Sequence, residues 1–460
     1  MKKIAKTTSN QAWAGLIALA FSGVHGAALA QSDTLAIDAG QPLTYAEHVA
    51  PIINENCVVC HREGGIAPMQ FTNYDQIRPW APLIQYKVSR REMPPYAYDQ
   101  HIGIQDLVGD WRLKQEYIDT IVAWIDQGAP EGTYSGEVAS FELPDMEKWN
   151  FEEQFGRDPD LILPSDPIDV PANGNDMWHR PYVMTGLNED RCIAAVQVKP
   201  RGDSKTVIHH ANSSVEVMNE HGEWERYGQL TEYAMGKWGE AIPEGVCRTL
   251  PANARISWDI HIFPGGLGAT APGALLEDNV VEIGMWLHPE GYEDVVKYKQ
   301  DLSLYGLSPS QGEMVIPPHG YLMTQGFHSF DHPVRIDSFQ PHGHLRMRAA
   351  SLEIFYPDTG RTEEISQISN WSATWHHSHI YNPDVAPLLP AGAVLIIKQW
   401  YDNTADNPNN PDPDQFVVGG SRTADEMSHA WIAVTHLDQE GYDKLLAERK
   451  DKEQRAVAGN

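Results

Sequence analysis

The feature of this chain that most restricts its fold is a series of short apolar runs separated by turn signals over roughly its last 280 residues. Helical periodicity fades in this region. Pro357-Asp358-Thr359-Gly360 has the composition of a hairpin turn, and residues 402–413 are too rich in Asn, Asp and Pro for a regular element. Many short strands predict two mainly-β, jelly-roll-like sandwich domains. The apolar runs are residues 193–198, 207–217, 256–263, 280–287, 352–356 and 394–400.

The first thirty residues have the three parts of a secretory signal peptide. Lys2, Lys3 and Lys6 form a basic start, an apolar stretch follows at 12–21, and Ala28-Leu29-Ala30 fits a cleavage site. No later apolar run approaches the roughly 18 residues that span a bilayer. We therefore expect a soluble periplasmic protein without a membrane span. An uncleaved N-terminal anchor is the alternative.

The chain is strongly acidic, with a formal net charge of −29. Such a surface repels nucleic acid and anionic membranes, which excludes both as expected partners. It suits a cationic redox partner, although acidic residues also serve solubility alone.

A Cys-x-x-Cys-His motif is formed by Cys57, Cys60 and His61. In c-type haem attachment the two thiols add across the porphyrin vinyl groups and the histidine becomes the proximal iron ligand. A zinc or redox cysteine pair is the alternative, but it needs a second ligand pair or a thioredoxin-like context, and the sequence offers neither. The motif therefore predicts one covalent haem c.

The sixth iron ligand is less defined by the sequence. Met93, in a stretch stiffened by Pro94 and Pro95, is the favoured candidate, and a thioether there would raise the reduction potential. Met69 is the competitor, and His101 is a weaker one.

Helical signals surround the Cys-x-x-Cys-His motif. Thr44-Tyr45-Ala46-Glu47 has the pattern of a capping box, and Gly128 and Pro130 end a later helical stripe. These signals predict a small all-α cytochrome c domain. The stripe consists of Ile118, Ile121, Val122 and Ile125.

The composition changes to Pro, Gly, Ser and acidic residues after this stripe, as expected of a linker. The predicted organisation is a signal peptide (1–30), a cytochrome c domain (31–135), a linker and entry segment (136–171), a first β-sandwich (172–308), a second β-sandwich (309–445) and a polar C-terminal tail (446–460).

Two cysteines, Cys192 and Cys247, remain outside the haem motif. An even pair in an oxidising compartment most often forms a disulfide, which we predict. Two buried thiols, or a pair of metal ligands, are the alternatives.

Histidines gather in three places within the β-type region: His209-His210, His261, and His342-Gly343-His344. Residues two apart in a strand face the same side, so His342 and His344 can chelate one ion. Adjacent residues face opposite sides, so His209 and His210 can bind one ion only at a strand end or a β-bulge.

From about residue 160 to 434 the chain resembles the copper type II, ascorbate-dependent monooxygenases, whose animal members include peptidylglycine α-hydroxylating monooxygenase and dopamine β-monooxygenase. The order and spacing of five elements carry the resemblance. They are His209-His210, Asp259-Ile260-His261, residues 341–346, Asp402-Asn403 leading into 409–413, and Asp425-Glu426-Met427. Residues 43–131 are similar to the cytochrome c domain of a bacterial branch of this family.

The resemblance implies two copper ions. One would be held by His209, His210 and His261, and the other, the oxygen-binding and catalytic one, by His342, His344 and Met427. Imidazole suits both oxidation states of copper, and a thioether favours Cu(I).

The implied function is a periplasmic copper-dependent monooxygenase that hydroxylates a C–H bond of a small organic substrate with O2. The haem would deliver electrons from a periplasmic redox protein or a small reductant. The alternative is a non-catalytic electron-transfer or copper-binding protein. A haem-dependent dehydrogenase subunit is less favoured because no organic-cofactor motif is present.

The chain departs from the animal enzymes at Trp375-His376-His377-Ser378-His379. These histidines are candidates for a further metal site, a wall that contacts substrate, or a solvated loop, and the last two are favoured. Arg346 and Arg348 lie beside the second histidine pair and could bind a substrate carboxylate, but structural ion pairs explain them equally well. The sequence indicates neither the substrate nor the oligomeric state.

Overall fold

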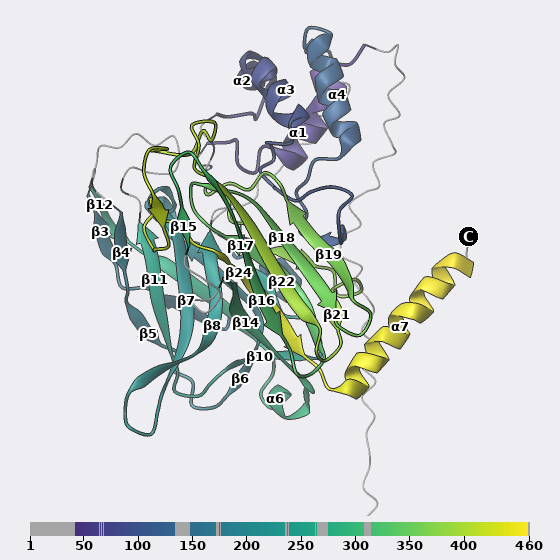
Figure 1. Ribbon diagram of the computed structural model, residues 1–460. Coiled ribbons are helices and arrows are strands. Elements are labelled where there is room, and N and C mark those ends of the chain that lie inside the picture. The colour runs from purple at the N-terminus through teal and green to yellow at the C-terminus, as the bar shows by residue number, and fades with distance from the viewer. Residues whose placement is uncertain are drawn as a thin grey trace, which may run out of the picture. The chain divides into compact units, whose positions relative to one another are not determined.

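The computed structural model describes residues 42–458, with gaps at 64, 66, 68, 134–147, 172–173, 175, 235–236, 238, 263, 265–274 and 308–313. Residues Leu43–Asn460 form one compact unit that consists mostly of β-strands (Figure 1). The predicted signal peptide lies outside the described residues. Among the helices that are described, none is long and apolar enough to cross a membrane.

Short helices surround the Cys-x-x-Cys-His motif and enclose a small apolar cluster that includes Ile53, Ile121 and Trp124. Helix α4 confirms the predicted amphipathic stripe. The capping box does not form, because the Thr44 side chain makes no capping hydrogen bond. The helices are η1 (Tyr45–Val49), α1 (Ala50–Asn56), α2 (Tyr74–Ile77), η2 (Arg78–Trp80), α3 (Ala81–Ser89) and α4 (Gln115–Asp126).

The predicted separate all-α cytochrome c domain is wrong. Strand β1 (Leu107–Val108) pairs with β20 (His379–Tyr381), which is far away in the sequence. Tyr96, Tyr98 and Leu107 are buried in the apolar core of the C-terminal half rather than among the helices. Periodicity within the segment could not reveal this, because the partner that buries the 96–107 loop lies more than 200 residues downstream.

A 16-stranded sheet runs through the described chain in the order β1-β20-β17-β24-β14-β10-β6-β13-β2, with further strands attached to this path. The other strands of the path are β17 (Val334–His342), β24 (His429–His436), β14 (Tyr298–Gly306), β10 (Val246–Leu250), β6 (Arg191–Pro200), β13 (Val281–Leu287) and β2 (Leu161–Pro164). The attached strands are β4 (Met177–His179), β5 (Tyr182–Met184), β7 (Ile208–Met218), β8 (Trp224–Ala234), β9 (Glu240–Ala241), β11 (Arg255–Ile262) and β21 (Leu388–Leu389).

Smaller sheets complete the β structure. A four-stranded sheet has the order β16 (Tyr321–Ser329), β22 (Val394–Asp402), β18 (Met347–Tyr356), β19 (Arg361–Ile368). Two-stranded sheets pair β3 (Ile168–Val170) with β12 (Leu276–Asn279), and β15 (Val315–Ile316) with β23 (Val417–Val418). Each of the six predicted apolar runs falls on a strand, with only Val207 and Val280 of their described residues lying just before the strand begins, and the predicted hairpin turn joins β18 to β19.

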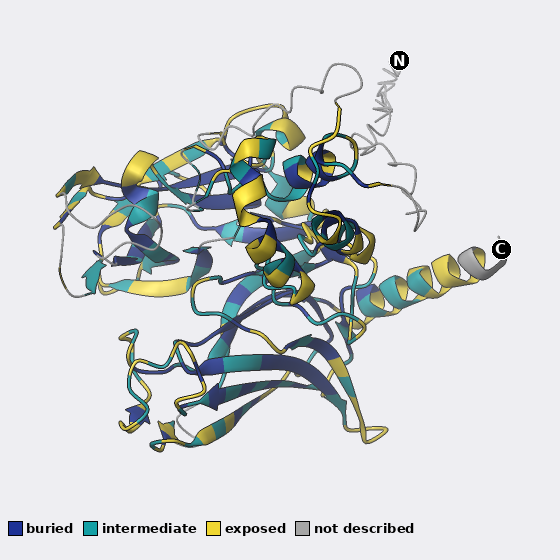
Figure 2. Cartoon of the chain, turned by 90° about the horizontal axis from the view of Figure 1, so that it is seen from above, coloured by how far each residue is buried: buried dark blue, intermediate teal, exposed yellow. Residues whose placement is uncertain are grey.

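The predicted organisation into independent β-sandwich domains is wrong as well. β14 belongs to the expected first sandwich, yet it pairs with β24 of the expected second one from Lys299↔His436 to Gly306↔His429. One hydrogen-bonded sheet therefore joins the two halves. Each half nevertheless has its own apolar core, one containing Phe339 and Tyr401, and the other containing Ile260. The strands carry most of the buried residues in Figure 2.

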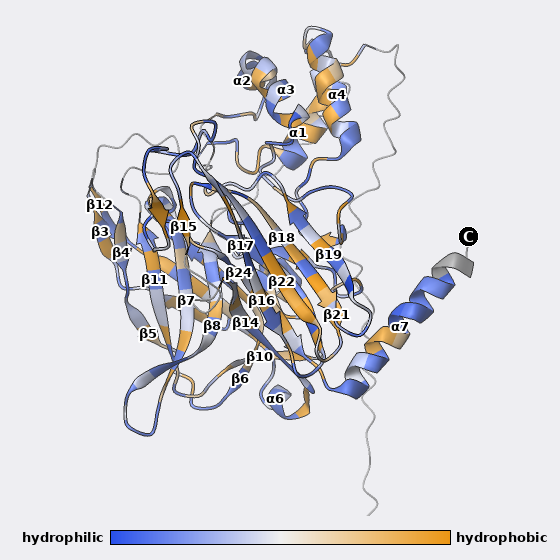
Figure 3. Cartoon of the chain, viewed as in Figure 1, coloured by the Kyte–Doolittle hydropathy of each residue, from blue (hydrophilic) through white to orange (hydrophobic). Residues whose placement is uncertain are grey.

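Alternation along individual strands explains how these cores form. Buried residues alternate with partly exposed ones along the whole of β22, and β22 and β18 carry hydrophobic stretches in Figure 3. The predicted disulfide is present, because Cys192 on β6 and Cys247 on β10 are bonded with their Cα atoms 5.0 Å apart. By chain entropy, a loop of this size contributes on the order of 4 kcal/mol to stability.

Two segments are more regular than the sequence indicates. The expected linker and entry segment contains α5 (Glu152–Phe155), β2 and β3, and both strands pair with the first half. The expected polar tail is the end of α7 (Gln439–Ala458), which Lys452 joins to Asp384 by an ion pair. The remaining short helices are η3 (Gly202–Thr206) and α6 (Tyr292–Val295).

Candidate metal centres

The Cys-x-x-Cys-His motif forms a tight turn at the end of α1. The backbone N–H groups of Cys60 and His61 both donate to the carbonyl of Cys57, at 3.1 and 2.9 Å. Cys57 and Cys60 are free thiols, and burial raises their pKa values to about 12 and about 11. Imidazole Nδ1 of His61 lies 3.1 Å from the Met69 carbonyl, and the ring stacks on Phe71.

This arrangement fits a c-type haem. A ring nitrogen that donates to a backbone carbonyl fixes the tautomer and leaves the other nitrogen as a metal ligand. In His61 that free ligand is Nε2, and the two unpaired thiols are available for the vinyl groups. The side chain of Met69 packs against the same apolar cluster as Cys57. Met93 lines a cavity of about 310 Å3 with Tyr96 and Tyr98. The choice between Met93 and Met69 stays open.

The first predicted copper set lies on two paired strands. His209 and His210 are on β7, His261 is on β11, and His261 pairs with His210. The register shifts at the next pair, which joins Ile262 to Ile208 and leaves His209 as the extra residue of a β-bulge. This is the geometry that the sequence required for adjacent histidines to face one ion.

The distances in this trihistidine set suit a metal. Nδ1 of His209 lies 3.2 Å from Nδ1 of His261 and 3.2 Å from Nδ1 of His210. Metal–imidazole bonds of about 2.0 Å at tetrahedral angles separate their nitrogens by about 3.3 Å. The ring of His261 stacks on Trp178, and its Nε2 lies 3.4 Å from Asp176 Oδ2. Such outer contacts hold a ligand ring in place.

The second predicted set lies where β17 ends and β24 begins. His342 is the last residue of β17, His344 follows in a turn, and Met427 precedes β24. The imidazole centroids of His342 and His344 are 5.5 Å apart. Nδ1 of His344 lies 3.0 Å from the carbonyl of Asp425, which leaves its Nε2 available. Two imidazoles and a thioether form a donor set that suits copper.

Loops rather than strands hold this second set. The carboxylate of Glu426 accepts the backbone N–H groups of His344 at 2.7 Å and of Arg346 at 2.6 Å. Burial raises the pKa of Glu426 to about 7. The amide of Asn407 donates to the Leu345 carbonyl, and the hydroxyl of Tyr401 donates to the carbonyl of Met427 at 2.6 Å.

Both predicted sets border one cavity of about 220 Å3, which is lined by His210, His342, His344 and Met427. The ring centroids of His210 and His342 are only 6.0 Å apart. The indole of Trp258 and part of Trp178 also line it. The fold therefore brings together histidines that are more than 130 residues apart in the sequence.

Sequence reasoning missed Glu232 and His429 at this place, and it named His376 without placing it beside the second predicted copper set. His376 is 3% exposed, and its ring centroid lies 4.9 Å from that of His342. His429 stacks on His342 at 4.8 Å, and Glu232 of β8 is buried beside His342 and His376. Of the two favoured interpretations of 375–379, the solvated loop is wrong, since His376, His377 and His379 are all buried. A wall that contacts substrate stays a prediction. The spacing of His429 two residues after Met427 was the available signal for that residue.

Burial lowers the pKa values of five of these histidines, which together are called the histidine cluster below: His209, His210, His342, His344 and His429. It lowers the pKa of His209 to about 3 and those of His344 and His429 to about 4, and neighbouring imidazoles lower them further. The pKa values of His210 and His342 are also well below the ordinary value for the same reason. Neutral imidazoles have a free lone pair, so the cluster is ready to bind metal at neutral pH.

Arg346 is unsuited to binding an anionic substrate. Its side chain is 2% exposed, and Nη1 donates to the carbonyl of Ala424 at 2.8 Å. Burial lowers its pKa. Between the two interpretations given by the sequence, these contacts favour a structural role for Arg346.

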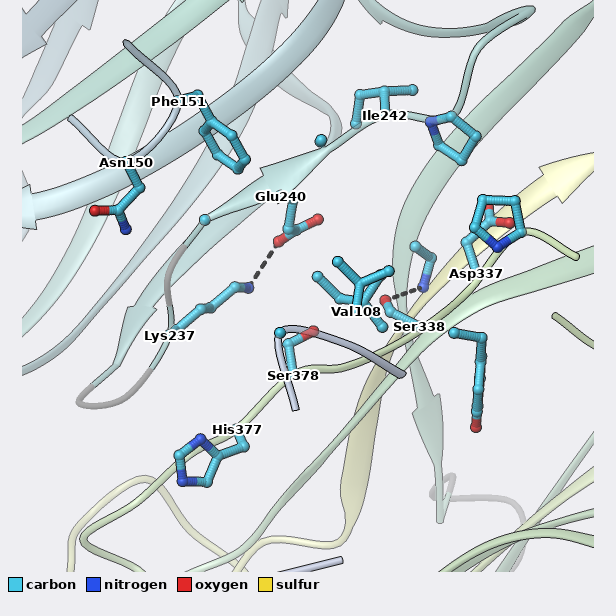
Figure 4. A pocket seen from close by; sticks show the side chains of 18 of the residues that line it. Val108, Asn150, Phe151, Lys237, Glu240, Ile242, Asp337, Ser338, His377 and Ser378 are labelled. Carbon is cyan, nitrogen blue, oxygen red and sulfur yellow. Dashed lines mark hydrogen bonds and ion pairs between the residues drawn. The ribbon is translucent and has the colours of Figure 1, made fainter. Parts of the chain in front are cut away.

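A larger cavity of about 510 Å3 is lined by His377 but by none of the residues of the two predicted copper sets (Figure 4). Val108, Phe151, Ile242 and His377 line it, and Lys237 reaches Glu240 at 2.7 Å. Lys237 Nζ also donates to Gln340 Oε1 at 3.2 Å. The walls are mostly apolar and the charges are paired, as in cavities that bind small organic molecules.

Comparisons with known proteins add no functional information. No protein-family model matches the chain, and no curated protein matches it. Among solved structures, the major capsid protein P2 of bacteriophage PM2 is 8% identical with a TM-score of 0.23, covering 61% of this chain and 100% of that one. A tandem CBM22 domain of Paenibacillus barcinonensis Xyn10C is 11% identical with a TM-score of 0.15, covering 59% and 86%. Similarities this low carry no argument about the chain.

Proposed function

We propose that this chain is a periplasmic copper-dependent monooxygenase that hydroxylates a C–H bond of a small organic substrate with O2. One observation carries the proposal: two separately predicted ligand sets border the same cavity of about 220 Å3. The family resemblance requires both sets, and their side chains supply donor atoms that suit copper. The disulfide between Cys192 and Cys247 is consistent with an oxidising compartment.

Each set has its own role in this proposal. His209, His210 and His261 would hold an electron-transferring copper, and His342, His344 and Met427 would hold the copper at which O2 reacts. When bound, the copper ions and the haem would supply the one-electron steps that reduce O2 and oxidise the substrate C–H bond.

The side chains of the chain position these groups and exclude water. Neutral imidazoles offer their lone pairs without first losing a proton. Glu426 fixes the His344 turn through two backbone hydrogen bonds, and Trp258 covers part of the cavity. The mostly apolar cavity of about 510 Å3, which His377 lines, offers room for a small organic substrate.

The haem would act as the internal electron donor, supplied in turn by a periplasmic redox protein or a small reductant. A continuous series of contacts supports this role. His377 contacts the carbonyl of Pro95, which lies two residues after Met93, and its ring centroid is 5.0 Å from that of Tyr96. His376, which directly precedes His377 in the chain, contacts the ring of His342. The Met93 loop is thereby joined to the histidine cluster.

Oxygen incorporation tests the proposal. Haem- and copper-loaded protein is incubated with a reductant, 18O2 and a mixture of small organic compounds, and the products are analysed by mass spectrometry. A hydroxylated product carrying one 18O atom is expected from wild type and not from His342→Ala. Protein that binds two coppers and passes electrons from haem to copper, but forms no labelled product, would instead be a non-catalytic electron-transfer protein.

A further inference from the structure

Three acid and imidazole side chains meet beside the second predicted copper set. Glu232 on β8, His342 on β17 and His376 place their ligand atoms within 4.8 Å of one another. All three side chains are buried, with exposures of 2, 4 and 3%. His376 and Glu232 belong to neither predicted copper set, so this group needs its own explanation.

The polar atoms of this group have no protein partners among the described residues. Glu232 Oε1, His342 Nδ1 and both ring nitrogens of His376 are buried without a hydrogen bond. His376 Nδ1 and Glu232 Oε1 are 4.0 Å apart, which is too far for a hydrogen bond. Each buried polar atom left unsatisfied is costly, and buried polar atoms are normally paired. Several such atoms that face one another indicate a missing common partner.

The three ligands are held from different directions. The other carboxylate oxygen of Glu232 accepts a hydrogen bond from Gln340, which precedes His342 by two residues on the same strand. Gln340 in turn accepts from Lys237 at 3.2 Å. The ring of His376 packs against Trp371, with 5.5 Å between centroids. The site is therefore built by fixed neighbours, as metal ligands usually are.

We propose that Glu232, His342 and His376 bind a divalent transition-metal cation at a third site, which shares His342 with the second predicted copper set but uses neither His344 nor Met427. Two imidazoles and one carboxylate suit Zn2+ or Cu2+, whereas the thioether of Met427 favours Cu+. A cation bound by one donor atom from each residue gives a partner to three of the four unpartnered atoms, and one ring nitrogen of His376 is left over. The inference rests on this geometry alone and does not depend on monooxygenase activity.

Zinc is the probe for this site, because it does not change oxidation state and prefers His and carboxylate ligands. Haem-loaded protein freed of other metals is titrated with Zn2+, and bound zinc is counted by elemental analysis. Glu232→Gln and His376→Ala are each expected to lower the affinity for one zinc ion by more than tenfold. Met427→Ala is expected to retain it, which separates this site from the thioether-containing set.

Matched controls distinguish ligand loss from general damage. Glu353→Gln changes a nearly buried glutamate that pairs with Lys398, and His379→Ala changes a buried histidine of the same segment. Both should bind zinc as wild type does. Zinc binding by Glu232→Gln and His376→Ala at wild-type affinity would overturn the proposal.

A measurement on the unaltered protein guards against variants that do not fold. Crystals of the wild type soaked in Zn2+ should give an anomalous peak about 2.0–2.2 Å from a ligand atom of each of the three residues. Saturating zinc without a peak there would also overturn the proposal. Absence of copper at the other two sets would contradict the proposed function and leave this result unaffected.

Discussion

The two predicted copper sets are held in different ways. His209, His210 and His261 stand on paired strands, where a β-bulge places Nδ1 of His209 3.2 Å from Nδ1 of His210 and of His261. In the second set, only His342 is on a strand, and loop contacts position His344 and Met427. Sheet register makes the first set rigid. The second set depends on the loop contacts around it. Changes to those contacts should therefore affect metal binding at the second set and not at the first.

Acidification is expected to have the largest effect on the free energy of unfolding. The first set should contribute more to this loss of stability than the second set does. The folded-state pKa values of His209, about 3, and of His344 and His429, about 4, lie below the ordinary value. Below about pH 6.5 the unfolded chain binds protons that the folded chain does not, so each such histidine lowers the free energy of unfolding by about 1.4 kcal/mol per pH unit. The loss continues until the pH reaches the folded-state pKa.

Glu426 opposes this loss at the second set. Its folded-state pKa of about 7 is raised, so its protonation favours the folded chain as the pH falls from about 7 towards the ordinary value. Urea unfolding of the metal-free protein between pH 7 and pH 4.5 measures the combined effect of the histidines and Glu426 on the free energy of unfolding. A free energy of unfolding that does not fall over this range would show that the cluster is not held neutral.

Removal of the Glu426 side chain should damage the second set alone. Glu426→Ala leaves the buried N–H groups of His344 and Arg346 without an acceptor, at about 1–3 kcal/mol each. We expect a lower melting temperature and loss of copper from the second set, with copper retained by the trihistidine set. Glu353→Ala is the control for loss of a buried glutamate. Equal copper loss from both sets would refute the difference in how they are held.

Met427→Leu should change metal preference with little change in stability. Leucine has nearly the volume of methionine, so the expected cost is below about 1.5 kcal/mol. Loss of the thioether should weaken Cu+ binding at the second set by about tenfold or more and leave the trihistidine set unchanged. Competition with a Cu+ chelator measures this. Unchanged Cu+ affinity would exclude Met427 as a ligand.

Arg346→Gln is expected to have the smallest effect. It removes one hydrogen bond to the Ala424 carbonyl, which is worth about 1 kcal/mol. Because Arg346 is buried, the KM for a substrate that the protein hydroxylates should remain within about twofold of the wild-type value. A sharp rise in KM would restore the alternative in which Arg346 binds a substrate carboxylate.

The sequence predicts features that depend on local pattern. Short apolar runs separated by turn signals located the strands, and the adjacent His209 and His210 required a strand end or a bulge, which the structure supplies. Cysteine parity identified the disulfide. These inferences need only neighbouring residues or the redox compartment.

Features that depend on distant partners could not be predicted. The helices appeared to form their own domain because nothing near Leu107 indicates pairing with Tyr381. His376 lies in a polar stretch typical of a loop, and only packing against Trp371 and His342 buries it. Glu232 is an ordinary strand residue until β17 is placed beside β8. Burial of polar residues is decided by tertiary contacts rather than by local pattern.

The copper-to-haem ratio tests most directly whether the histidine cluster holds two copper ions. Purified haem-loaded protein is loaded anaerobically with Cu+, which disfavours the carboxylate-containing site, and analysed beside His209→Ala and His342→Ala. Two coppers per haem are expected in wild type and one in each variant. Wild-type protein that takes up no copper would contradict the two-copper interpretation.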